Sequence, residues 1–316
     1  LCTPDFINNA ANKISRRFGK GMGIKIHDIV KNEILINLMK VDEKRLTNFE
    51  PCVNSCSFVS PYWNPFTAIR WLAAKAIPAP KGSGPAATAG YAFYQTRSGY
   101  NFESYDKFAS KEPVARMVVG HNPDEMEDDS DLGIIPLNQL TVESSADLLK
   151  GLNLGSYSSN VMTLDLKDMK FEQHPFNINK YYKDVSVMNS RVTPEFYSGF
   201  DTNQTYTRIM SKISDSALFS EGTYTQDFTK QLSQSSLREK LFYNKKVVVE
   251  FISDYFLEIG EVVQLDVYKG TSDREQDYSV SGKYVIGKVE RTFKTSQDKM
   301  TSRLTLYTDS DGEVVD

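Results

Sequence analysis

The feature that most constrains the fold is a series of strand-like runs in the C-terminal part of the chain. Rich in Val, Tyr, Phe and Thr, which favour strands, the runs span Lys246 to Ile252, Val262 to Val267, Lys283 to Phe293 and Ser302 to Thr308. Gly260, Gly270 and Gly282 lie at the turns between them. Sequential strands with short turns predict an antiparallel sheet or small barrel rather than a βαβ nucleotide fold.

Residues 1–110 combine two predicted helices with a hairpin and form one α+β unit. Apolar spacing predicts a helix over 4–18 and a second helix opening at Asn64, whereas 24–39 is apolar but ambiguous, with strand-like alternation. Gly90 to Phe108 alternates as a hairpin with Ser98-Gly99 at its turn. We expect this helix and hairpin to pack together through a structural core of Trp63, Phe66, Ile69, Tyr91 and Phe93.

The middle of the chain is less regular. An acidic loop, 122–131, separates the first unit from a strand predicted at Val161 to Phe171. Residues 172–222 are polar and weakly periodic, which predicts an insertion with little sheet of its own. Thr225 to Tyr243 has the apolar spacing of a helix.

Charge and cysteine content argue against a nucleic-acid-binding protein and a disulfide-rich protein. A net charge of −4 and a pI near 5.6 argue against a protein that holds nucleic acid electrostatically. Three cysteines are too few for a disulfide framework and favour a reducing compartment. The sequence has no apolar run long enough for a membrane span and no signal-peptide pattern. It starts at Leu1 without Met, so we expect a longer gene product.

The sequence contains no motif that predicts a catalytic or ligand-binding site. Gly19-Lys20-Gly21-Met22-Gly23 lacks the Ser or Thr that must follow the Lys of a phosphate loop, so it is interpreted as a helix stop. Cys52 and Cys56 have the spacing of some zinc ligands. The residues that could complete such a site are Cys2, His27, His121 and His174, and these form no second pair. We therefore predict no catalytic residues, no metal and no cofactor.

Two segments resemble a known family. The first runs from Phe58-Val-Ser-Pro-Tyr-Trp-Asn-Pro-Phe through Ile77 and then from Tyr91 to Phe108. It is similar to the middle domain of baseplate hub proteins from T-even-type contractile-tailed bacteriophages. The second comprises Leu257 to Leu265, Ser281-Gly-Lys-Tyr-Val-Ile-Gly-Lys-Val-Glu290 and Met300-Thr-Ser-Arg-Leu-Thr-Leu306. It is similar to the closing strands of hub tube domains, phage late control proteins and the hub part of type VI secretion spikes.

The resemblance implies a structural role in the virion. Hub proteins form a homotrimeric ring that joins the tail tube to a membrane-piercing spike and lets DNA pass through the lumen without specific binding. Partners are then the central spike and the tail tube or tube-initiator proteins, with assembly in the host cytoplasm and no membrane insertion by this chain. The oligomer or tube interface is expected on the C-terminal strands, at Val262, Val263, Leu265, Tyr284, Val285 and Val289.

The same resemblance implies a domain division. Residues 1–110 form an α+β middle domain, 111–171 with 235–316 an antiparallel β-barrel tube-like domain, and 172–234 an insertion. Family members carry a further N-terminal tube domain, which is expected before Leu1. Two alternatives stay open: the hub of a type VI or pyocin-like injection machine, and a glycan hydrolase of the tail.

Overall fold

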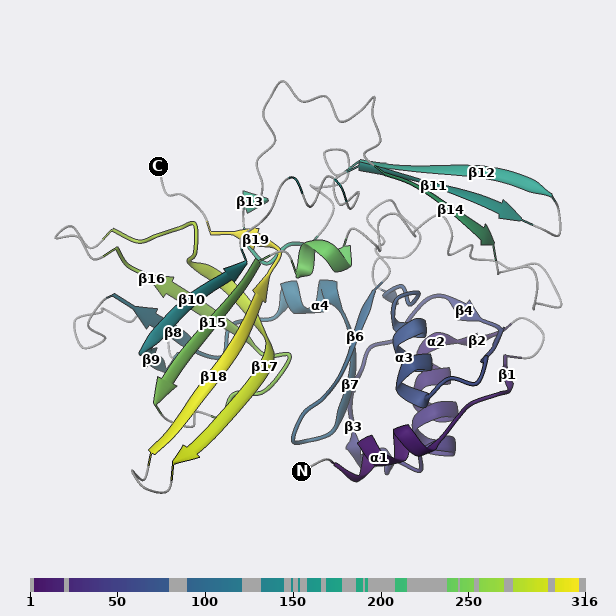
Figure 1. The fold of residues 1–316 in the computed structure, drawn as a ribbon, viewed down its shortest axis with the longest axis horizontal. Helices are drawn as coiled ribbons and strands as arrows, with labels where there is room; N and C mark the ends of the chain where they lie inside the picture. The colour runs from purple at the N-terminus through teal and green to yellow at the C-terminus, as the bar shows by residue number, and fades with distance from the viewer. Residues whose placement is uncertain are drawn as a thin grey trace. The chain divides into compact units, whose positions relative to one another are not determined.

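The computed structural model shows a β-rich α+β protein (Figure 1). The residues that it describes are 3–19, 23–79, 90–120, 132–144, 149, 153, 158–165, 169–177, 186–189, 191–192, 208–214, 238–243, 245–252, 256–269, 275–294 and 299–312. The acidic loop and most of the helix expected from Thr225 lie outside this set. The chain divides into unit 1 (Leu1–Tyr105, Leu152–Val185, Asp201–Glu239) and unit 2 (Asp106–Gly151, Ser186–Phe200, Lys240–Asp316).

Unit 1 opens with short helices and strands around a core of aliphatic and aromatic side chains. Its N-terminal elements are α1 (Pro4–Ala11), β1 (Arg17–Phe18), β2 (Ile24–Lys25), α2 (Ile26–Asp28), η1 (Ile29–Leu38), η2 (Glu43–Arg45), β3 (Leu46–Phe49), β4 (Ser55–Cys56), β5 (Phe58–Val59), α3 (Pro65–Ala73), β6 (Tyr91–Gln95) and β7 (Tyr100–Ser104). The predicted hairpin is present: β6 pairs antiparallel with β7, and β3 joins β7 in parallel. Helix α3 starts after Asn64 with Pro65 in its first turn, as predicted.

One prediction for this unit was wrong in extent, and one run that the sequence left ambiguous is assigned by the structure. The first helix ends at Ala11, and Ile14 pairs instead with Trp63 in an isolated bridge. The strand-like run at 24–39 is mainly helical: α2 leads into the π-helix η1, with Ile29, Val30, Ile34 and Leu35 buried. Tertiary packing buries these apolar side chains while Asn32 and Asn37 of the same helix stay exposed, and this packing outweighs the strand preference of Ile and Val.

A separate three-stranded sheet contains β11 (Ser158–Asp165), β12 (Lys170–Asn177) and β14 (Arg208–Ser214). Strand β11 is central, antiparallel to β12 and parallel to β14. The expectation that 172–222 holds little sheet is therefore wrong for 172–177 and 208–214. Polar strands with weak alternation lack the apolar periodicity from which strands are predicted.

Unit 2 is built on a seven-stranded sheet. Its members are β8 (Arg116–Val119), β9 (Ile134–Pro136), β10 (Gln139–Ser144), β15 (Lys245–Ile252), β16 (Val262–Val267), β17 (Gly282–Lys294) and β18 (Lys299–Thr308), in the order β10-β15-β18-β17-β16-β8-β9. The four predicted C-terminal strands are all present. Pairing is antiparallel from β10 to β16 but parallel between β16, β8 and β9, so the wholly antiparallel prediction was wrong. Helix α4 (Tyr105–Ser110) spans the boundary between the units.

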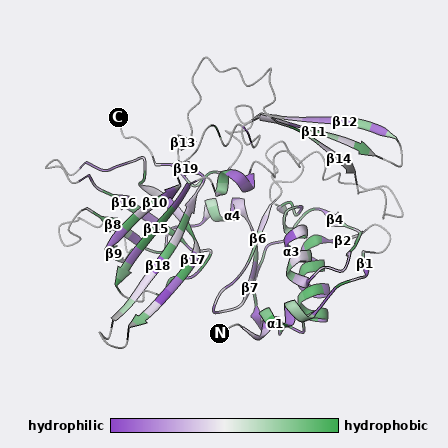
Figure 2. Ribbon diagram, in the orientation of Figure 1, coloured by the Kyte–Doolittle hydropathy of each residue, from purple (hydrophilic) through white to green (hydrophobic). Residues whose placement is uncertain are grey.

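Alternation along these strands creates the second core. Inward side chains include Val249, Leu265, Ile286 and Leu304, whereas the other face is mixed and carries Val262 and Val285 as well as polar residues; Figure 2 shows both kinds along the strands. The β17–β18 register shifts at Gly287, where a Cβ atom would lie 2.4 Å from the Tyr307 ring. Glycine is therefore required at this bulge.

The two ends of this sheet are neighbouring segments of the chain. Strands β9 and β10 are separated only by Leu137 and Asn138. Leu137 donates its N–H to the Val118 carbonyl of β8 (2.9 Å), and Asn138 donates to the Glu250 carbonyl of β15 (2.8 Å). The strand ladders themselves do not close, so the predicted barrel is not confirmed by the pairing among the described strands.

Candidate functional site

The described residues contain no group of three or more His, Cys, Asp or Glu side chains able to hold a metal ion. Cys52 is buried and Cys56 half-buried in β4. His27 lies beside Cys52, with its Nδ1 atom 3.2 Å from Sγ. The same Nδ1 accepts the Cys52 backbone N–H at 3.1 Å, so the imidazole is neutral there, with its proton on Nε2.

A Cys next to a His can act as a nucleophile and its base, but here the pKa values of the two side chains do not suit that role. Burial raises the pKa of the Cys52 thiol to about 11, so the reactive thiolate is scarce at neutral pH. Burial also lowers the pKa of His27, although Asp28 opposes the shift. The Cys52 sulfur accepts the His27 backbone N–H, and the His27 ring accepts the Cys52 backbone N–H. The pair therefore has a structural role and links the segment after η1 to the residues before it.

The predicted core residues of the first domain come together. Ile69 and Tyr91 are buried, and Trp63, Phe66 and Phe93 are half-buried against the same cluster. The Phe66 and Phe93 rings contact each other with centroids 5.5 Å apart.

The residues predicted for an oligomer or tube interface lie inside the chain. The second core includes Val263, Leu265 and Tyr284, with Val289 packed against it. Val262 and Val285 are also buried and are paired across β16 and β17. Five of these side chains are thus buried within this chain, and Val289 is half-buried. Their role in an oligomer or tube interface stays a prediction.

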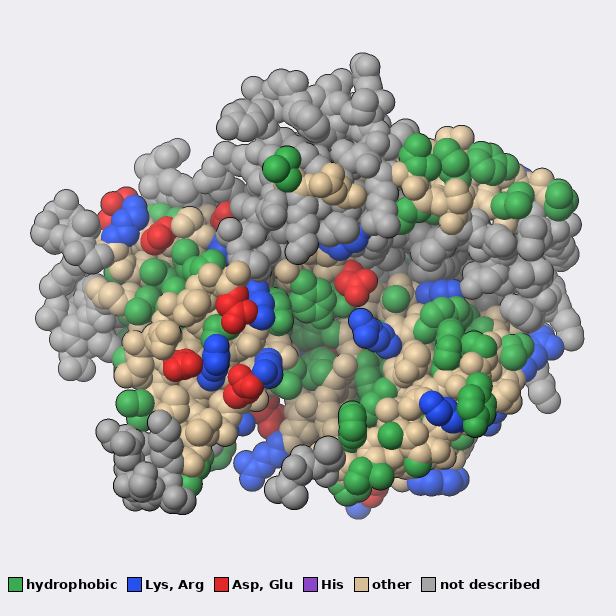
Figure 3. Space-filling view, viewed as in Figure 1, with side chains coloured by type: hydrophobic (Ala, Val, Ile, Leu, Met, Phe, Trp, Pro, Cys, Tyr) green, Lys and Arg blue, Asp and Glu red, His purple; other side chains and the backbone are tan. Residues whose placement is uncertain are grey.

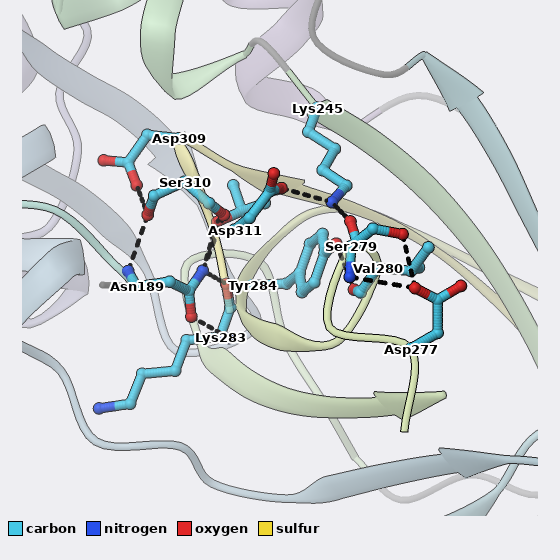
Figure 4. Close-up of polar contacts among 11 residues, drawn as sticks. Asn189, Lys245, Asp277, Ser279, Val280, Lys283, Tyr284, Asp309, Ser310 and Asp311 are labelled. Atoms are coloured by element: carbon cyan, nitrogen blue, oxygen red, sulfur yellow. Dashed lines mark hydrogen bonds and ion pairs between the residues drawn. The ribbon is translucent and has the colours of Figure 1, made fainter. Parts of the chain in front are cut away.

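The densest polar arrangement lies around Asn189, which sequence reasoning missed (Figure 4). Its Oδ1 accepts the Lys283 N–H at 2.7 Å, and its Nδ2 donates to Lys283 O, Thr308 Oγ1 and Ser310 O at 3.2, 3.0 and 3.0 Å. Its backbone N–H donates to Ser310 Oγ at 2.7 Å. Gly282 allows this approach, because a Cβ atom there would lie 2.8 Å from Asn189 Oδ1.

The Asn189 contacts fasten a short strand to the end of the sheet. Strand β13 (Arg191–Val192) pairs antiparallel with β19 (Ser310–Asp311) immediately beyond Asn189. The partners of Asn189 lie about a hundred residues away in sequence, between 94 and 121 positions. A local sequence motif contains no information about contacts between segments so far apart, so the sequence could not predict this network.

An ion pair completes this polar region. Lys245 Nζ lies 2.7 Å from Asp311 Oδ1 and also donates to the Ser279 carbonyl. Tyr284 donates its hydroxyl to the Val280 carbonyl at 2.6 Å, and burial, then the charges of Asp311 and Asp277, raise its pKa. The tyrosine is therefore a fixed hydrogen-bond donor, and the arrangement is suited to holding β19 and β13 rather than to moving protons.

Across the part of the chain that the structure describes, no helix combines the length and the apolarity needed to cross a membrane.

Comparison with known proteins gives a likeness in fold. No protein-family model matches the chain, and no curated protein matches its sequence. A tail protein from Neisseria meningitidis MC58 is 10% identical and superposes over 94% of this chain and 70% of its own length, with a TM-score of 0.51. That likeness shows a shared fold.

Two further structures were found. The 43 kDa tail protein of prophage MuSo2 from Shewanella oneidensis is 8% identical over 96% of this chain and 70% of its own, with a TM-score of 0.49. The phage P2 baseplate in its activated conformation gives 9% identity over 95% of this chain and 68% of that one, with a TM-score of 0.26.

Proposed function

We propose that this chain is a structural, non-catalytic subunit of the baseplate hub of a contractile bacteriophage tail. Three copies form a ring between the tail tube and the membrane-piercing spike, and DNA passes through its lumen without specific binding. The observation that carries the proposal is the fold shared with the tail protein from Neisseria meningitidis MC58 over 94% of this chain. The segments Tyr91 to Phe108 and Ser281 to Glu290, which resemble hub proteins, support it independently.

The tube-like part of the proposed hub is the seven-stranded sheet, closed into a barrel by the β9–β10 segment. Closure is supported by the adjacent hydrogen bonds of Leu137 to β8 and of Asn138 to β15, because two consecutive residues then bond to the next-to-last strand at each end of one sheet. A closed sheet has no free edge for unintended pairing. In sequence the domain was assigned to 111–171 and 235–316, but β11 pairs with β12 and β14 instead.

The other parts take supporting roles. Residues 1–110 form the middle domain, and 172–234 contribute an insertion in which 172–177 and β14 belong to the β11 sheet and β13 pairs with β19. The Asn189 network ties the segment after the insertion's first half back onto the end of the tube-like sheet. Such fastening suits a part that transmits load rather than one that turns over substrate.

The oligomeric state tests the proposal. Light scattering on this chain at several concentrations is expected to show association that reaches the mass of a trimer as the concentration rises. Addition of the spike protein from the same phage is expected to shift the chain towards the trimer by mass action. A monomer that persists with the spike present would remove the hub assignment.

A further inference from the structure

Helix α1 is held on unit 1 by a polar stripe. The residues of this stripe are half-buried and occupy the i, i+3, i+4 and i+7 positions of one helical face: Asp5, Asn8, Asn9 and Asn12. Asp5 forms an ion pair with Arg45 at 2.8 Å. Asn8 donates its side-chain amide to the Met39 carbonyl at 3.0 Å. Polar contacts, rather than a buried apolar face, therefore hold this helix in place.

The apolar side chains of α1 add little to its attachment. Phe6 is 56% exposed and Ile7 is 61% exposed, and no residue of the helix is buried. Figure 3 shows hydrophobic side chains on the surface at the place that α1 occupies in Figure 1. A helix of eight residues is not stable by itself in water, because isolated helices become marginal only at roughly 12–15 residues. The helix therefore exists only while its polar contacts hold, and each of these contributes little net free energy.

The chain is anchored in the core just after the helix. Ile14 is 2% exposed, and its N–H donates to the Trp63 carbonyl at 2.7 Å. Asn12, which follows the helix, already has an extended backbone conformation. We call residues 3–13 the strap. Because the anchor is at Ile14, the strap can detach at Lys13 while the core stays packed.

One side chain of the strap caps another helix. Helix α3 begins after Asn64, whose backbone has the extended conformation of an N-cap residue, but the Asn64 side chain makes no capping hydrogen bond. Asn9 supplies the cap instead, because its Oδ1 accepts the Phe66 N–H at 2.8 Å. A residue 57 positions away in sequence thus bonds the N–H that an N-cap side chain ordinarily satisfies.

The Asn64 side chain is itself held by the strap. Its Nδ2 donates to the Asn9 carbonyl at 3.2 Å, and its Oδ1 accepts a hydrogen bond from Lys13 Nζ. Asparagine is among the most favourable N-cap residues, and Phe66 occupies the second helical position, whose N–H an N-cap side chain can reach. When the strap leaves, Asn64 Oδ1 loses Lys13 and can accept the Phe66 N–H.

We propose that residues 3–13 are a releasable strap and that its release transfers the N-cap of α3 from Asn9 to Asn64. The exchange keeps α3 capped in both states, so the strap can leave without unfolding the core against which α3 packs. The segment before Ile14 then changes its place while the core of unit 1 keeps its structure. The inference concerns a movement within one chain and does not depend on the proposed hub function.

Native-state hydrogen exchange on the full chain tests the release. The reporters are the amides of Ile7 and Asn12, which are bonded within the strap, and the amide of Glu50, which is bonded to β7. After correction for intrinsic rates, both strap amides are expected to exchange at least about tenfold faster than Glu50 and to respond little to low concentrations of urea. Protection of the strap equal to that of Glu50, with the same dependence on urea, overturns the proposal, because the strap would then open only on global unfolding.

Two alanine variants and their combination test the transfer of the cap, with exchange read at the Phe66 amide. Asn9→Ala is expected to speed exchange of the strap amides about three- to tenfold, while Phe66 stays protected because Asn64 accepts its N–H. Asn64→Ala alone is expected to leave Phe66 protected by Asn9. Only the double variant is expected to lose this protection, with Phe66 exchange at least about tenfold faster than in Asn9→Ala.

Asn37→Ala, at an exposed asparagine of η1, is the matched control and is expected to change exchange neither in the strap nor at Phe66. The urea midpoints of both single variants are expected to stay close to that of the parent protein, because the core is unchanged. Phe66 exchange in Asn9→Ala that is already as fast as in the double variant would mean that Asn64 does not take over the cap, and it overturns the proposal. An equal effect of Asn37→Ala on the strap amides overturns it as well.

Discussion

At the residue scale, Phe66 joins helix α3 to the β6–β7 hairpin. Its ring contacts Phe93 at 5.5 Å and Tyr100 at 6.2 Å, but the side chain is only half-buried. Phe66→Ala is therefore expected to cost about 2–3 kcal/mol, less than the roughly 3–5 kcal/mol of a fully buried Phe. Phe102, with no exposed surface, is expected to show that full cost on change to Ala.

Urea denaturation of the two variants measures this difference, with Phe6→Ala as the exposed control. An unchanged midpoint for Phe66→Ala would mean that the apolar face of α3 has been assigned to the wrong side.

His27 makes the stability of the fold depend on pH. Because burial lowers its pKa from the ordinary value of 6.5, the unfolded chain binds the proton more readily than the folded one. Stability is thus complete above about pH 6.5 and decreases as the pH falls towards the lower pKa of the folded state. His27→Asn, whose side-chain oxygen can still accept the Cys52 N–H, is expected to reduce the loss of stability between about pH 7.5 and pH 5.5.

Thermal or urea unfolding at the two pH values measures that loss. An equal loss in the variant and in the parent protein would show that other groups cause the acid sensitivity.

At the element scale, Asn189 holds β13 and β19 to the ends of β17 and β18. Asn189→Ala removes four side-chain hydrogen bonds and leaves the Lys283 N–H without its acceptor. The expected cost is roughly 1–3 kcal/mol, the range for leaving a buried polar group unpaired. Ser279→Ala, at an exposed site of the same region, is the matched control.

Hydrogen exchange locates the effect: the amides of Lys283 and of Asn189 itself are expected to lose protection before those of the sheet centre. Uniform loss across the sheet would mean that Asn189 stabilises the whole unit and not this junction.

The elements that could be predicted from sequence are those with strong local signals. The C-terminal strands and the β6–β7 hairpin combine alternation with glycine turns, so their bounds are close to those expected. Helix η1 was unpredictable because its isoleucines fit a strand and a buried helix equally well until packing is known. The β8–β9 parallel pairs and the Asn189 contacts join distant segments, and local periodicity contains no information about them.

At the scale of the whole molecule, the two units differ in the sign of their net charge. Unit 2 combines a β-sheet core with a net charge of −9, from 16 Lys and Arg against 25 Asp and Glu, which would weaken DNA binding in the proposed lumen. Unit 1 carries the positive charge, +5 from 21 Lys and Arg against 16 Asp and Glu, and the outward apolar face of α1.

Absence of catalysis is the prediction that concerns the entire chain. The Cys52 thiol has a pKa of about 11 and its neighbour His27 accepts a backbone N–H, so the described Cys–His pair cannot act as nucleophile and base. Tyr284 is locked as a donor to a carbonyl group. Purified protein is therefore expected neither to clear peptidoglycan nor to hydrolyse ATP, with a phage lysozyme and an ATPase as positive controls. Turnover that is lost when one particular Asp, Glu or His is replaced, while the unfolding midpoint is kept, would make the chain an enzyme and favour the glycan-hydrolase alternative.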